Sequence, residues 1–234
     1  MYTELELSHV QETLRVLQRR IQERFPDSSL STVAAELCQI AEETGPVIDR
    51  LMRPSRVVRA IVALGVVLLL GLAVGLFVLL SSMSLDVDGL GSMLQAIESA
   101  AQDVIFLGVA IFFLLTIEGR LKRRVALRDL RQLRAVVHIV DMHQLTKDPE
   151  HLLVPEMRTP SSPDRQFTRF ELSRYLDYCT ELLSLASKLA ALHAQCVNDP
   201  VVLDAVNDIE VLASNLSNKI WQKIMILDTM PGLE

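Results

Sequence analysis

Three residues near the middle of the chain are of the types that bind metal ions. His138, Asp141 and His143 lie within six positions of one another. His138 and Asp141 share one face of a helix, but His143 lies on another, so the three converge only if the helix breaks. Zinc sites also use four ligands, or three plus water. We therefore expect no metal and no cofactor. If a metal ion did bind, these three residues would be its candidate ligands.

Arg131 and His138 are separated by six residues in an arginine-rich helix. This spacing resembles the Arg–His motif of HEPN-type ribonucleases, helical-bundle proteins common in bacterial defence. The resemblance covers eight residues, and it implies that Arg131 and His138 of two protomers form a composite cleavage site. The sequence has no P-loop, GxGxxG, HExxH, nucleophile-elbow or kinase motif. We therefore expect no enzymatic activity, and keep a membrane-anchored ribonuclease as an alternative.

Two apolar stretches are long enough to cross a membrane as helices. Residues 60–80 carry no charge, and twenty such residues span about 30 Å, the thickness of the hydrocarbon core. Residues 104–117 form a shorter stretch, which reaches spanning length when it is extended back to Ala100, with Asp103 at the outer interface. We expect a helical hairpin with spans at about 60–82 and 100–117.

The charges around these stretches indicate their orientation. Residues 81–103 contain no lysine or arginine, whereas basic residues flank the other ends of both spans. Because cytoplasmic flanks collect Lys and Arg, we expect both termini in the cytoplasm of a multi-pass protein. The preference for arginine over lysine is typical of bacteria, so the expected location is the bacterial inner membrane. The basic residues are Arg50, Arg53, Arg56 and Arg59, then Arg120, Lys122, Arg123, Arg124 and Arg128.

Gly71 and Gly75 form a GxxxG motif inside the first apolar stretch. Two glycines four residues apart allow a second helix to approach closely in lipid. That second helix belongs either to another copy of the chain or to the second span of the same chain, where Gly108 is also small. Both interpretations remain open from the sequence.

The rest of the chain has the pattern of amphipathic helices, so the predicted fold class is all-α. A first helix ends before Pro26, and a second breaks at Gly45-Pro46. Thr168 and Glu171 form a capping box, and Asp199-Pro200 starts the final helix. The expected segments are cytoplasmic N-terminal helices at 1–56, the transmembrane hairpin at 57–119 with its outer loop at 83–99, a basic helix at 120–145, a proline-containing loop at 146–168 and an antiparallel helical hairpin at 169–234.

The basic helix continues the second span and has two distinct faces. One face is an apolar seam at the heptad spacing of a coiled coil: Ala126, Leu130, Leu133, Val137 and Val140. The other face is basic: Arg120, Arg124, Arg131 and Arg134. Its distal part is expected to meet acidic groups of this chain or a neighbour, such as Asp199, Asp204, Asp208 and Glu210. The stripe is short and lacks aromatic residues, so no nucleic-acid partner is expected.

These observations favour a non-enzymatic, membrane-anchored adaptor or sensor. The expected partners are the lipid bilayer, further copies of the chain in a homo-oligomer, and a cytoplasmic protein. The spans contain no ionisable residue near the midplane, which argues against an ion-coupled transporter. A pore-forming two-span effector of a bacterial conflict system is the first alternative, and the ribonuclease is the second.

Overall fold

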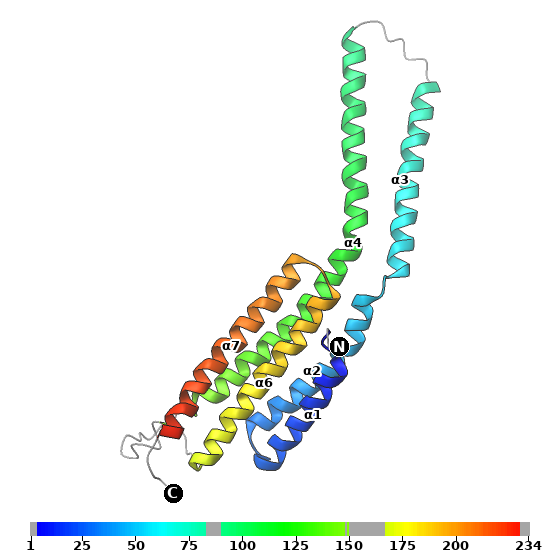
Figure 1. The fold of residues 1–234 in the computed structure, drawn as a ribbon. Coiled ribbons are helices and arrows are strands. Elements are labelled where there is room, and N and C mark those ends of the chain that lie inside the picture. The colour runs from blue at the N-terminus through cyan, green and yellow to red at the C-terminus, as the bar shows by residue number, and fades with distance from the viewer. Residues whose placement is uncertain (1–3, 83–89, 148, 150–166, 230–234) are drawn as a thin grey trace. The chain divides into compact units, whose positions relative to one another are not determined.

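The regular structure of the chain is helical, as predicted (Figure 1). The computed structural model describes residues 4–82, 90–147, 149 and 167–229, and no strand occurs among them. The proline-containing loop and the hairpin tip therefore lie largely outside the described residues. The helices are α1 (Leu7–Arg24), α2 (Ser29–Met52), α3 (Arg56–Ser82), α4 (Leu90–Leu145), α6 (Arg169–Cys196) and α7 (Pro200–Thr229).

The chain divides into two compact units. One unit combines Met1–Met52 with Arg123–Glu234, and the other is Arg53–Lys122. We call the first unit the bundle and the second the hairpin. The helix α4 belongs to both, because its first part lies in the hairpin and its last part in the bundle.

The bundle encloses one apolar core. The helix α6 packs against α1, α2 and α7, and buried residues lie on several sides of it, including Leu176, Leu182 and Leu189. The α4 seam contributes to the same core, because all five of its predicted residues are buried. Burial of this apolar surface is the main contribution to the stability of the bundle.

Local capping chemistry starts the helices where the sequence predicts. The Thr168 side chain accepts a hydrogen bond from the backbone N–H of Glu171, and the Glu171 carboxylate accepts one from the backbone N–H of Thr168. This capping box starts α6. At α2, the Ser28 hydroxyl accepts a hydrogen bond from the Ser31 N–H.

The expected break at Gly45-Pro46 is wrong, because α2 continues through Pro46 to Met52. Proline usually ends a helix because it lacks an N–H and crowds the preceding turn. Here Leu51 is buried beyond the proline, and Val47 and Ile48 pack against the core. Tertiary packing of this last part of α2 outweighs the local cost of the proline.

The hairpin contains two helices long and apolar enough to cross a membrane, α3 and the first part of α4. None of the most apolar stretch of either helix is buried within the structure. The helix α4 begins at Leu90, so the outer loop expected at 83–99 is shorter than predicted. Residues 90–99 are mostly good helix formers, and a span can continue as a helix beyond its apolar part.

Glu118 joins the two helices of the hairpin just beyond the expected second span. Its carboxylate accepts hydrogen bonds from the Arg59 side chain at 3.0 Å and from the Ser55 backbone N–H at 3.2 Å. Lys122 lies 3.5 Å away on the next turn of α4. The hydrogen bond from Arg59 is the main reason why the pKa of Glu118 lies below its usual range. Glu118 is therefore ionised at neutral pH.

Candidate functional site

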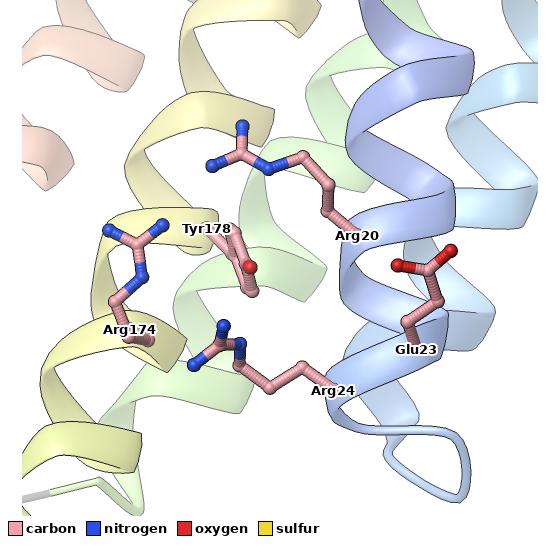
Figure 2. Close-up of a pocket in the computed structure, with 5 residues that line it drawn as sticks. All are labelled: Arg20, Glu23, Arg24, Arg174 and Tyr178. Carbon is pink, nitrogen blue, oxygen red and sulfur yellow. The ribbon is translucent and has the colours of Figure 1, made fainter.

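A pocket between α1 and α6 is lined by three arginines (Figure 2). Arg20 and Arg24 lie one turn apart on α1, and Arg174 and Tyr178 lie one turn apart on α6. The three guanidinium groups lie around Tyr178, while the carboxylate of Glu23, which also lines the pocket, lies apart from them (Figure 2). The cavity has a volume of about 330 Å³.

Two aromatic rings contact the three arginines. The Arg20 and Arg174 guanidinium carbons lie 5.6 Å and 5.3 Å from the centre of the Tyr178 ring, within the range of a cation–π interaction. Arg24 lies 5.3 Å from the ring of Phe170. These contacts hold planar hydrogen-bond donors in defined positions without consuming their N–H groups.

The arginines are only partly neutralised. Arg20 lies 3.5 Å from Glu181 and Arg174 lies 3.1 Å from Asp177, and all four side chains are partly exposed. Arg24 has no carboxylate within 4.0 Å in the part of the chain that the structure describes. Because exposed ion pairs are worth about 0–1 kcal/mol, an incoming anion can compete for these cations.

Comparison of the chain with protein-family models, curated proteins and solved structures gives no match. The residues and their geometry therefore carry the functional argument.

The candidate catalytic pair is not assembled within one chain. Arg131 and His138 are both exposed on α4, two helical turns apart, which corresponds to about 10 Å along the axis. The Arg131 side chain donates a hydrogen bond to the carbonyl oxygen of Leu127 in its own helix. The composite ribonuclease site stays a prediction that needs a second protomer.

The candidate metal ligands point to different partners. Asp141 accepts a hydrogen bond from Gln144 at 2.7 Å, and the His143 Nδ1 lies 3.0 Å from the Ser29 hydroxyl. Burial, and then the charge of Lys147, lower the pKa of His143. His138 is exposed. Within the described ranges, no group of three such side chains could hold a metal ion.

The basic residues of α4 meet several different partners. In the hairpin, the Arg120 guanidinium lies 4.7 Å from the ring centre of Phe113. In the bundle, Arg134 lies 3.6 Å from Asp208, one of the acidic groups expected to meet this helix. Arg123 and Asp199 form a closer pair, with 2.6 Å between nitrogen and oxygen.

Asp199 has two functions at the start of α7. One carboxylate oxygen accepts a hydrogen bond from the Val201 N–H at 3.0 Å, which caps the helix, and the other accepts one from Arg123 at 2.8 Å. Burial alone would raise the pKa of Asp199, but the hydrogen bonds from Arg123 and Val201 outweigh it and hold this pKa below its usual value. Asp199 therefore links α4 to the α6–α7 turn.

Replacing Asp199 by alanine should lower the free energy of unfolding of the bundle by about 2 kcal/mol, because both the cap and the Arg123 hydrogen bond are lost. Asp199→Asn should lower the free energy of unfolding by about half as much, since the amide oxygen of asparagine still caps the helix. Urea unfolding of the full chain in detergent, followed by Trp221 fluorescence, measures the change. Trp221 is the only tryptophan of the chain and lies in α7, so it reports on the bundle.

The effect of Asp199 on the free energy of unfolding should also depend on pH, and a second position on α7 provides a control. Because the pKa of Asp199 is depressed by folding, its contribution is complete above the unfolded value of about 3.9 and is lost as the pH falls below it. The difference between Asp199→Asn and the native chain should therefore shrink below about pH 4. Asp204→Ala, on the exposed side of α7, should change stability by less than about 0.5 kcal/mol. An equal loss of unfolding free energy in Asp199→Ala and Asp204→Ala would contradict the role assigned to Asp199.

The glycines of the predicted packing motif are open among the residues that the structure describes. A Cβ built on Gly71, Gly75 or Gly108 meets no atom within 4 Å. The close approach inside the hairpin is instead at Gly65, where a Cβ would lie 3.3 Å from Leu114. Gly65 could not be singled out from the sequence, because it lies outside the GxxxG spacing.

The bundle also contains buried polar and thiol groups that the candidate pocket does not use. His193 is fully buried; its Nδ1 lies 3.1 Å from the Leu189 oxygen, and its Nε2 lies 3.6 Å from Asp129, longer than a hydrogen bond. Burial raises the pKa of Cys179 to about 12 and that of Cys38 to about 11. Both thiols are therefore protonated at neutral pH and poor nucleophiles.

Proposed function

We propose that this chain is an inner-membrane protein that acts as an oligomeric, non-enzymatic adaptor or sensor. In this proposal the hairpin crosses the bilayer, both termini lie in the cytoplasm, and the bundle is the part that meets a ligand or a protein partner.

One observation carries the proposal, the contrast in burial between the two units. The bundle buries its large apolar residues in one core. In the hairpin, leucines, valines, isoleucines and phenylalanines of α3 and α4 are exposed around both helices. Helices that are apolar on all faces need an apolar surrounding, and a lipid bilayer provides one of the matching thickness.

The charge pattern supports the orientation. The start of α3 and the middle of α4, which are joined through Glu118, carry Arg59, Lys122 and further basic residues, which favour the cytoplasmic side. Residues 81–103 of the sequence, which run from the last residues of α3 into the first part of α4, contain acidic groups but no lysine or arginine.

The open glycine face supports self-association. Gly71 and Gly75 offer a surface of small residues that the other helix of the hairpin leaves free. In lipid, such a surface allows close helix packing and interhelical van der Waals contact. A second copy of α3 has the same surface, so the motif is suited to a symmetric homo-oligomer.

Crosslinking of the full chain in native membranes tests the oligomer. We expect a discrete oligomer, and replacement of both Gly71 and Gly75 by leucine should weaken it roughly tenfold, equivalent to about 1.4 kcal/mol. The matched control is Gly119→Leu, because Gly119 is equally open but lies outside the motif.

Two further results distinguish packing between copies of the chain from packing within the hairpin. Gly65→Leu should disturb the hairpin through its contact with Leu114 and should not remove the oligomer selectively. A strictly monomeric native protein in membranes would overturn the oligomeric part of the proposal.

A further inference from the structure

We propose that the pocket formed by Arg20, Arg24, Arg174 and Tyr178 binds the phosphate group of a small ligand. The inference rests on the proposed role of the bundle as a sensor, and it assigns that sensor a class of ligand. The binding itself can be measured independently of any oligomer.

The first argument is the type and number of donors. Arginine presents a planar fork of N–H groups that matches phosphate oxygens in pairs. Three guanidinium groups from two helices lie around Tyr178 at the pocket (Figure 2). A dianionic phosphate in the pocket would accept hydrogen bonds from several of them.

The second argument is an unused hydroxyl. Tyr178 is 98% buried, with a residue exposure of 2%, yet it lines the pocket. Its hydroxyl makes no hydrogen bond to any residue within the described parts of the chain. Because the hydroxyl oxygen is not fully shielded from solvent, this donor is open to a bound oxygen in the pocket.

The third argument concerns the present partners of the arginines. The pairs with Glu181 and Asp177 are partly exposed and therefore weak, and Arg24 has no such pair among the described residues. A phosphate can thus gain charge-assisted hydrogen bonds without first breaking a strong internal network.

The aromatic ring limits the kind of ligand. Two guanidinium groups already lie over the Tyr178 ring, so no nucleobase can stack on it without displacing them. Recognition then depends on the phosphate and not on an attached base. The ligand is a phosphate-bearing small molecule or a phosphate-bearing lipid headgroup, and these share the same chemistry at the pocket.

The test uses the full chain in nanodiscs of phosphatidylcholine, titrated with pyrophosphate by calorimetry. Arg24→Gln and Arg174→Gln should each raise the Kd about tenfold or more, because each removes a charge-assisted hydrogen bond. Tyr178→Phe should raise it several-fold and leave the fold intact. The matched control is Arg19→Gln, since Arg19 is an exposed neighbour on α1 that does not line the pocket.

A second arm separates the two sources of phosphate. Hydrogen exchange of α1 and α6 is compared in nanodiscs with and without phosphatidic acid, and with pyrophosphate added. Protection of these helices by pyrophosphate identifies a soluble ligand, whereas protection by phosphatidic acid alone identifies a lipid headgroup. In both cases Arg24→Gln should remove the protection. The proposal is overturned if neither compound protects these helices, or if Arg19→Gln weakens binding as much as Arg24→Gln.

These outcomes are distinct from those of the crosslinking experiment. Loss of phosphate binding with an intact oligomer would remove only the ligand assignment. A monomeric protein that still binds pyrophosphate would keep the pocket and remove the oligomeric adaptor role.

Discussion

Replacing both Leu68 and Leu72 by arginine should release the protein from membranes. These side chains are 64% and 70% exposed near the middle of the apolar part of α3, so the described residues leave most of each side chain uncovered. One arginine at the centre of a span costs about 2.5–3.5 kcal/mol in membrane insertion, so two cost about 5–7 kcal/mol. Flotation of cell extracts in a density gradient measures the result, because membrane-bound protein floats and aggregated protein does not.

The control for this experiment is an arginine on another exposed leucine. Leu203 is 40% exposed on α7, in the bundle, and Leu203→Arg should leave flotation unchanged. If the double variant of Leu68 and Leu72 still floated with the membranes, the prediction that membrane anchoring requires α3 would be wrong. Equal loss of flotation in Leu203→Arg would show that the assay reports misfolding in general.

The second large effect is expected in the core of the bundle. Leu182 is fully buried on α6, the helix that packs against α1, α2 and α7. Leu182→Ala should lower the free energy of unfolding by about 2–5 kcal/mol, because it removes buried apolar contact and leaves a cavity. Urea unfolding followed by Trp221 fluorescence measures this loss.

The exposed Leu203 again provides the matched control, since Leu203→Ala removes the same atoms from a partly solvated position. Its effect should stay below about 1 kcal/mol. Similar losses for the two leucines would contradict the core as described, because the packing argument depends on the difference in burial between them.

Much of the fold follows from local chemistry in the sequence. The capping box at Thr168 and the Asp199-Pro200 start of α7 were predicted correctly, because these signals act within one helical turn. The α4 seam was predicted correctly, because heptad spacing alone places it on one face. The continuation of the second apolar stretch as one helix to Leu145 was also predicted.

Other features depend on contacts that no local pattern contains. The continuation of α2 through Pro46 depends on the burial of Leu51 in the finished bundle. The pocket brings together Arg24 and Arg174, which come from helices far apart in the sequence. The residues around either arginine alone therefore do not indicate a binding site. Their i,i+4 spacings to Arg20 and Tyr178 are common on helix surfaces and point to no particular ligand.

The central claim is a two-span anchor with the bundle in the cytoplasm, and cysteine labelling in spheroplasts tests it most directly. In a chain whose three native cysteines are replaced by alanine, single cysteines are placed at Ser84, between the two spans, and at Ser214, on the exposed side of α7. A membrane-impermeant maleimide should label Ser84→Cys in intact spheroplasts and Ser214→Cys only after permeabilisation. Labelling of Ser214→Cys in intact spheroplasts, with Ser84→Cys protected, would contradict the proposed topology.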